Sequence, residues 1–170
     1  MNKRQTTSNQ ISLNKKDSIL NGKKRLQVFS ISIIIGLMLG CSGTRPENIG
    51  INYGKFAPCS PDPNCVCSQS DQTDTEHFIQ PLSYQSSKED AERKLAQILT
   101  TQPRCEIVKM ENGYIYAEFT SFLMRFKDDV QFYFDDSSKI IHVKSASRLG
   151  SGDLGVNRKR IETIRTEFNK

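Results

Sequence analysis

Apolar and polar residues alternate through much of the second half of the chain, and a period of two predicts β-strands. The clearest alternation covers residues 114–120, and Asn112 with Gly113 just before it predicts a tight hairpin turn. The same pattern predicts three further strands, at residues 106–110, 130–135 and 140–146. Residues 77–84 predict a short edge strand, because Pro81 cannot donate a ladder hydrogen bond.

The alternation changes phase after residue 120, where Phe122, Met124 and Phe126 continue at every second position. We interpret this slip as a β-bulge near Thr120 and Ser121. The strand is therefore expected to run on beyond the bulge.

Two segments repeat apolar residues at the spacing of an α-helix. In residues 86–102 the apolar positions follow Ser86 and Glu89, a pair typical of a helix start. The second helix begins at about residue 153 or 156 and ends near Phe168. The order β-α-β-β-β-β-α predicts an α+β domain, with an antiparallel sheet of about five strands backed by two helices.

The N-terminal forty residues have a different pattern. Lys23, Lys24 and Arg25 precede a mostly apolar run at 26–39, an order that is typical of an export signal. An uncleaved membrane-spanning helix is the alternative, but it needs about 20 apolar residues and this run is shorter.

Residues 38–41, with the sequence MLGC, resemble the lipobox of bacterial lipoproteins. The resemblance implies that residues 1–40 are a signal peptide and that Cys41 carries acyl chains, which anchor the protein to the cell-envelope membrane. Ser42, and not Asp, follows Cys41. In a Gram-negative cell this implies that the protein is anchored to the periplasmic face of the outer membrane.

Residues 41–57 are polar and contain Gly and Pro, which predicts a flexible lipidated tether, and residues 58–170 are long enough for a single domain. The formal net charge of +5 belongs to the signal, because residues 1–40 hold seven Lys or Arg and one Asp. Residues 41–170 therefore carry 17 basic and 18 acidic residues, a net charge of −1. This balance gives no reason to expect a nucleic-acid partner.

Four further cysteines favour disulfides in an exported chain. They are Cys59, Cys65, Cys67 and Cys105. Four cysteines allow three pairings, and the sequence does not choose among them. A bridge between Cys59 and Cys65 would close a short loop and contribute about 2 kcal/mol. A zinc site that adds His77 is the alternative, but the C-x₅-C-x-C spacing matches structural zinc motifs poorly, so we assign no metal.

Residues 150–155, with the sequence GSGDLG, fit the dinucleotide pattern G-x-G-x-x-G and lie between a predicted strand and a helix. No further strand follows that helix, although a dinucleotide-binding fold requires one. We therefore predict a glycine-rich connection with positive φ, and no cofactor.

Basic residues gather around the start of this helix, and helix N-termini are ready anion sites. The candidate site for a small anionic ligand or an envelope-protein partner comprises Arg125, Arg148, Asp153, Asn157, Arg158 and Arg160. The alternative is a structural network in which Asp128, Asp129 and Asp153 pair with the arginines and cap the helix.

The sequence contains no evident catalytic set. A Cys–His nucleophile would require a cysteine beside His77 or His142, and Asp128 and Asp129 would point to opposite faces of a strand. The leading hypothesis is therefore a non-catalytic binding domain. An envelope hydrolase or thiol-dependent enzyme, and a structural or assembly lipoprotein, are the alternatives.

Two blocks of sequence carry a family resemblance. They are CSPDPNCV at 59–66 and a run that begins with FKDDV at 126–130, continues through KSASR at 144–148 and ends with DLGVNRKRI at 153–161. They resemble the uncharacterised family numbered 1499 among domains of unknown function, over most of residues 57–168. The resemblance implies a bacterial or plastid-associated domain that is often exported and has no established activity.

Overall fold

The computed structural model describes residues 42–170, so the predicted signal peptide and Cys41 lie outside the described residues. Six strands and two helices make up this part of the chain. In chain order they are β1 (Cys65–Cys67), β2 (Leu82–Ser83), α2 (Lys88–Thr101), β3 (Cys105–Glu111), β4 (Tyr114–Thr120), β5 (Lys127–Asp135), β6 (Ile140–Ser147) and α3 (Val156–Phe168). Neither helix of this part is long and apolar enough to cross a membrane.

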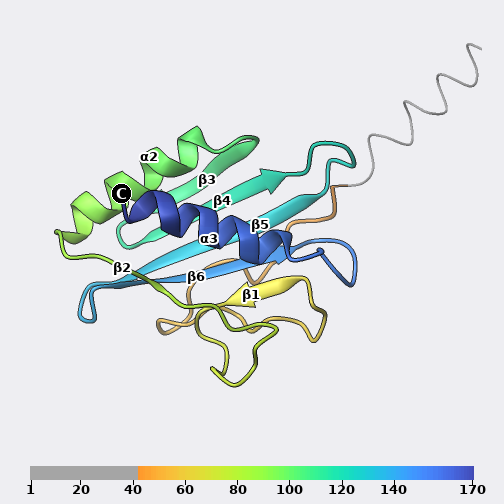
Figure 1. The fold of residues 1–170 in the computed structure, drawn as a ribbon, viewed down its shortest axis with the longest axis horizontal. Coiled ribbons are helices and arrows are strands. Elements are labelled where there is room, and N and C mark those ends of the chain that lie inside the picture. The colour runs from red at the N-terminus through yellow and green to blue at the C-terminus, as the bar shows by residue number, and fades with distance from the viewer. Residues whose placement is uncertain (1–41) are drawn as a thin grey trace, which may run out of the picture. The chain divides into compact units, whose positions relative to one another are not determined.

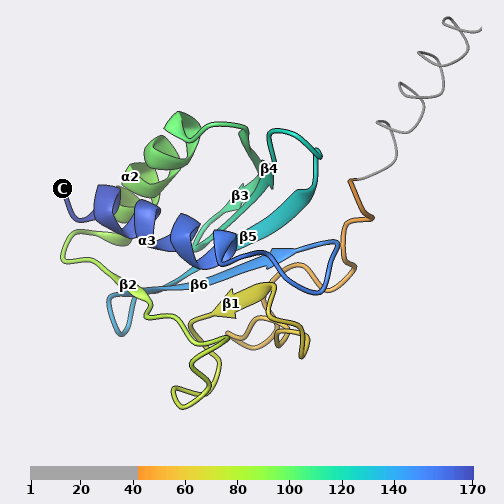
Figure 2. The ribbon, with the colours of Figure 1, turned by 45° about the vertical axis from the view of Figure 1, so that its right-hand side comes forward.

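The strands form one antiparallel sheet in the order β1-β6-β5-β4-β3, and β2 pairs with a separate stretch of β6. Both helices lie on one face of this sheet (Figure 1 and Figure 2). The predicted α+β class, an antiparallel sheet backed by two helices, is confirmed.

The main core fills the space between the helices and the sheet. Leu95 and Leu99 of α2 and Ile161 and Ile164 of α3 are fully buried in one cluster with Phe132 of β5. Burying a side chain of this size contributes about 1.5–3 kcal/mol. The apolar faces read from the helical spacing therefore fix both helices on the sheet.

The other face of the sheet is covered by residues 45–58, which we call the N-terminal strap. Phe56 is buried in the strap, and Ile49 and Ile51 pack with it against Tyr114 and Tyr116 of β4. The structure places these residues in the same compact unit as the rest of the domain. It therefore corrects the predicted flexible tether, because from residue 45 onward the segment is part of the fold.

Polar contacts also hold the strap. The backbone N–H of Gly50 donates to Oε1 of Gln131 at 2.8 Å. Nζ of Lys144 donates to the backbone oxygens of Ala57 at 2.7 Å and Pro58 at 3.2 Å. Burial lowers the pKa of Lys144, and the two carbonyl oxygens satisfy the ammonium group there.

Two local predictions differ from the structure by small shifts. The N-cap of α2 is Ser87, one residue later than predicted, and its side chain accepts from the N–H of Asp90 at 3.1 Å. The register shift lies in β3, between Ile107 and Lys109, whereas the predicted bulge lay near residue 120.

The predicted continuation of the strand beyond residue 120 is wrong. β4 ends at Thr120, which pairs with Lys127 at the start of β5, and residues 121–126 form the loop between them. Phe122 is 77% exposed and Met124 is 50% exposed. The apolar residues that suggested a strand therefore point into solvent instead of the core.

Candidate functional site

Arg148, directly after β6, is buried in a network of charged groups on the strap side of the sheet. Its Nε donates to Asp129 at 2.9 Å, and its Nη2 donates to both Asp129 and Glu118. Tyr116 donates to Asp129 at 2.6 Å, and Arg45 of the strap donates to Glu118. The Arg148 side chain is only 5% exposed, so it faces acids of its own fold.

Glu118 is the centre of this network. Burial alone would raise the pKa of its carboxyl, but hydrogen bonds from Lys127, Arg45 and Arg148 hold that pKa well below its usual range. Hydrogen bonding to Asp129 raises the pKa of Arg148 in turn. Both groups are therefore charged at neutral pH, and structural ion networks perturb pKa values just as catalytic sites do.

Asn157 and Arg160 of α3 form a second network on the helix side of the sheet. Arg160 donates to Asp128 and to the side-chain oxygen of Asn157. Asn157 is fully buried, its amide nitrogen donates to the backbone oxygen of Asn64 at 2.9 Å, and its Oδ1 accepts from Ser145 at 2.6 Å. This amide connects α3 to β6 and to the segment before β1, which is a structural role.

The adjacent acids Asp128 and Asp129 of β5 serve the two networks separately. Asp128 pairs with Arg160 on the helix side, and Asp129 pairs with Arg148 on the strap side. The two carboxylates therefore lie on opposite faces of the strand, as predicted, and do not form an acid–base pair.

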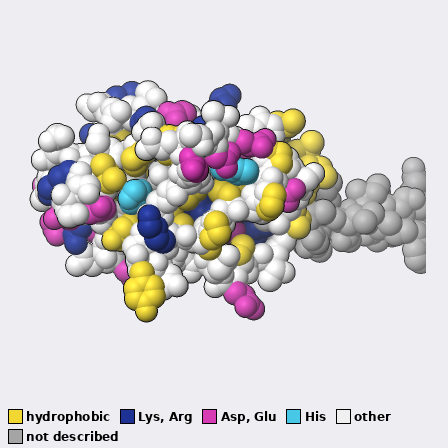
Figure 3. Space-filling model, turned by 90° about the horizontal axis from the view of Figure 1, so that it is seen from below, with side chains coloured by type: hydrophobic (Ala, Val, Ile, Leu, Met, Phe, Trp, Pro, Cys, Tyr) yellow, Lys and Arg dark blue, Asp and Glu magenta, His cyan; other side chains and the backbone are white. Residues whose placement is uncertain are grey.

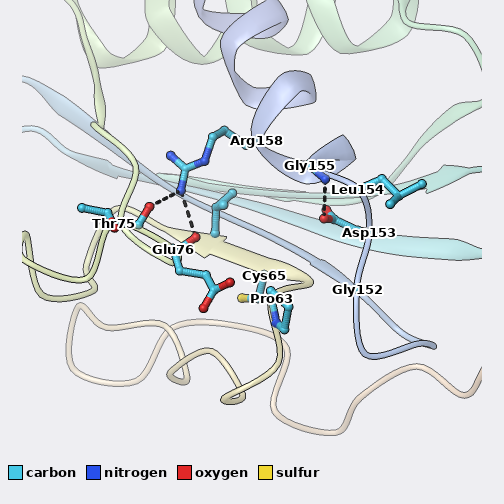
Figure 4. Close-up of a pocket in the computed structure, with 10 residues that line it drawn as sticks. Pro63, Cys65, Thr75, Glu76, Gly152, Asp153, Leu154, Gly155 and Arg158 are labelled. Carbon is cyan, nitrogen blue, oxygen red and sulfur yellow. Dashed lines mark hydrogen bonds between the residues drawn. The ribbon is translucent and has the colours of Figure 1, made fainter.

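Arg158 and Asp153 line a pocket of about 440 Å³ near the start of α3 (Figure 4). The Arg158 guanidinium donates to three backbone carbonyl oxygens at 2.9–3.2 Å. These belong to Thr75, Glu76 and Phe78. Arg158 therefore keeps neutral partners, unlike Arg148 and Arg160, although the residue Glu76 also lines the pocket.

Asp153 fills the N-terminus of α3. Its carboxylate accepts from the N–H of Gly155 at 2.8 Å and from that of Asn157 at 2.7 Å. Gly150 has φ 87° and Gly155 has φ 75°, so the predicted glycine-rich connection with positive φ is confirmed. The helix start thus holds a carboxylate of this chain.

Arg125 belongs to neither ion network and does not line the pocket beside Arg158. It belongs to the loop at 121–126, its φ is 58°, and within residues 42–170 its side chain forms no ion pair. The six predicted residues therefore do not converge on one cleft. Five of them divide between the two ion networks and the pocket.

The structure corrects the prediction that all four cysteines are bridged, because the described part of the chain contains one disulfide and leaves Cys67 and Cys105 unpaired. Cys59 and Cys65 form a disulfide, whereas Cys67 is buried as a free thiol and Cys105 is a partly buried one. Burial raises the pKa of Cys67, and it raises the pKa of Cys105 to about 11. Among residues 42–170, no group of three His, Cys, Asp or Glu is placed to hold a metal ion.

The two histidines lie apart on the face drawn in Figure 3. Nδ1 of His77 lies 2.7 Å from Asp74, and this hydrogen bond raises the pKa of His77. Nδ1 of His142 lies 3.2 Å from the Ser68 hydroxyl, and burial lowers the pKa of His142. In the described part of the chain, neither imidazole is hydrogen-bonded to a cysteine.

Sequence reasoning missed Glu118, Tyr116 and Arg45. One face of β4, with Ile115, Ala117 and Phe119, packs under the helices. A signal was present on the other face, where Tyr114, Tyr116 and Glu118 occupy alternate positions. All three side chains are buried, and the two tyrosines pack against the strap.

The family model described as "Protein of unknown function (DUF1499)" matches residues 55–168. The search of curated proteins finds no match. The matched region contains every helix and strand described above, the disulfide, the pocket at Arg158 and both ion networks apart from Arg45.

Proposed function

This chain belongs to the DUF1499 family, and from that premise we propose that it is a lipid-anchored envelope protein whose domain binds a ligand or partner without catalysis. The observation that carries the proposal is the order of a basic cluster, a short apolar run and the Gly40-Cys41 pair in the sequence. The acyl chains on Cys41 hold the protein to the membrane, on the periplasmic face of the outer membrane in a Gram-negative cell.

Two observations support binding over catalysis. The most strongly perturbed carboxyl, Glu118, is satisfied by three cations of its own fold. The two free thiols, Cys67 and Cys105, have raised pKa values, and a nucleophilic cysteine needs a lowered one.

The pocket beside Arg158 is the proposed binding site. The Arg158 guanidinium is held by backbone carbonyl oxygens, which orient the group without neutralising its charge. The pocket also contains Asp153, whose carboxylate is already bonded to backbone N–H groups. We propose a small ligand or partner side chain that presents a carboxylate or phosphate group to Arg158.

The anchor is tested by expressing the full chain in a bacterial host that is supplied with a clickable palmitate analogue. The wild-type chain should be labelled and recovered with the membranes, whereas Cys41→Ser should lose the label. Cys105→Ser is the matched control and should be labelled like the wild type. Equal labelling of the Cys41→Ser chain would show that residue 41 is not the anchor.

A further inference from the structure

One end of the sheet carries a group of exposed apolar side chains. On the β4–β5 loop Phe122, Leu123 and Met124 are at least half exposed. The connection between β6 and α3 adds Leu149 and Leu154, and the first residue of α3 adds Val156, each more than 40% exposed. We call these six residues the apolar tip. Single exposed apolar residues are common on soluble proteins, but gathered ones mark interaction surfaces.

Strand pairing brings the two loops to the same end. Thr120 pairs with Lys127 where β4 turns into β5, and the N–H of Arg148 donates to the backbone oxygen of the same Lys127 at 3.0 Å. The loop at 121–126 and the β6–α3 connection therefore start side by side. Both lie at the right-hand end of the sheet in Figure 1 and Figure 2.

The described chain also begins at this end. A Cβ placed on Gly43 would lie only 3.1 Å from Cγ of Leu149, so Gly43 lies against the apolar tip. The proposed lipid-bearing Cys41 precedes Gly43 by two residues, which reach at most about 7 Å when extended. Arg45 is bound to Glu118, so only three residues separate the proposed anchor from a residue that is tied to the sheet.

Positive charge borders the apolar tip. A pocket of about 490 Å³ beside it is lined by the cations Arg104, Lys159 and Arg160, and by the acid Asp128, which is paired with Arg160. The Arg104 guanidinium lies 5.4 Å from the centre of the Phe122 ring. Within the described residues neither Arg104 nor Lys159 forms an ion pair, so both place positive charge next to apolar surface, a combination that suits an anionic bilayer interface.

We propose that the apolar tip inserts into the interfacial layer of the membrane that holds the anchor, and that Arg104 and Lys159 contact its anionic headgroups. This inference rests on the proposed anchor at Cys41 and goes beyond it, because it fixes how the domain stands on the membrane. A second copy of the chain would also cover apolar side chains, but it explains neither the position of Gly43 nor the charge.

The absence of tryptophan from the sequence makes a sharp experiment available. Phe122→Trp places a fluorescent reporter in the apolar tip of the full lipidated chain. Tyr53→Trp is the matched control, because Tyr53 is fully exposed. The next residue, Gly54, lies near Tyr133, which pairs with Tyr114 at the other end of β4.

Both chains are reconstituted in vesicles of phosphatidylcholine and phosphatidylglycerol with brominated acyl chains. Insertion to a depth of about 5–10 Å brings the indole to the bromines, so the Phe122→Trp chain should lose roughly half its emission and shift to the blue. The Tyr53→Trp chain should change little. Arg104→Gln combined with Lys159→Gln should weaken the quenching, as should omission of phosphatidylglycerol.

Flotation of the same samples measures separately whether the lipid anchor attaches the protein to the vesicles. A chain that floats without quenching at position 122 overturns the apolar-tip proposal and leaves the anchor standing. A chain that neither floats nor shows quenching overturns both. A blue shift that appears without vesicles and grows with protein concentration identifies a second copy as the occupant and overturns the membrane contact. Quenching that is indifferent to phosphatidylglycerol overturns the headgroup contact.

Discussion

Replacing Glu118 with Gln tests how much the strap-side ion network stabilises the domain. The Glu118 side chain is 4% exposed and accepts hydrogen bonds from Arg45, Lys127 and Arg148. Gln keeps the shape and one acceptor oxygen but removes the charge, so Asp129 is left as the acid that pairs with the buried Arg148. Breaking a buried ion pair by removing one partner costs about 3–5 kcal/mol.

Urea unfolding of the purified chain at neutral pH measures this loss. With a denaturant slope of about 2 kcal/mol/M, the midpoint of Glu118→Gln should fall by roughly 1.5–2.5 M. Glu167→Gln is the matched control, because Glu167 forms an exposed pair with Lys170, worth at most about 1 kcal/mol. Equal midpoints for the two variants would refute the assigned role of the network.

The pH dependence provides a second measurement on the same variant. The folded-state pKa of Glu118 lies below its unfolded value of about 4.3, so its charge stabilises the fold above that pH. This contribution is lost as the pH falls toward the folded-state pKa. The difference in unfolding free energy between wild type and Glu118→Gln should therefore narrow from about pH 5 downward. A difference that stays constant down to the acid limit of folding would show that the Glu118 charge is not what stabilises the fold.

Two further predictions concern the pocket and a free thiol. Phosphate or citrate should bind the pocket and raise the melting temperature of the wild-type chain. At a ligand concentration of one hundred times the dissociation constant, binding adds about 2.7 kcal/mol to the free energy of unfolding. The rise in melting temperature should vanish in Arg158→Gln and persist in Arg93→Gln. Equal rises in the two variants would show that Arg158 does not bind the anion. In a Cys67→Ser chain, alkylation of Cys105 should be slow at pH 8 and should accelerate up to about pH 11, because burial raises the pKa of this thiol. Mass spectrometry measures the alkylation rate, and fast alkylation at pH 8 would show that the pKa of Cys105 is not raised.

The alternation and the helical spacing predicted most of the fold because they record local geometry. The start of β4 at Tyr114 and the end of the second helix at Phe168 were predicted as observed. The apolar residues at 121–126 misled the same reasoning. Their pattern matches a strand, but no partner strand or core extends to cover them.

The sequence predicted the candidate residues but not their ion-pair partners, because residue type does not determine which charged side chains come into contact. Arg148, Arg158 and Arg160 have the same side chain and lie within thirteen positions of one another. The fold neutralises two of them with acids of β4 and β5 and leaves the third on neutral carbonyls. The acids are contributed by strands far along the chain from the arginines, so no local pattern could assign the partners.

The amino-acid pattern was sufficient for the α+β class and for the apolar faces of both helices, because periodicity is a local property of a chain. Folding was needed to show that the strap belongs to the domain and that the apolar tip is exposed. Folding also selected the pairing of Cys59 with Cys65. These outcomes depend on which distant surfaces come into contact, and burial and ion pairing are set by those contacts.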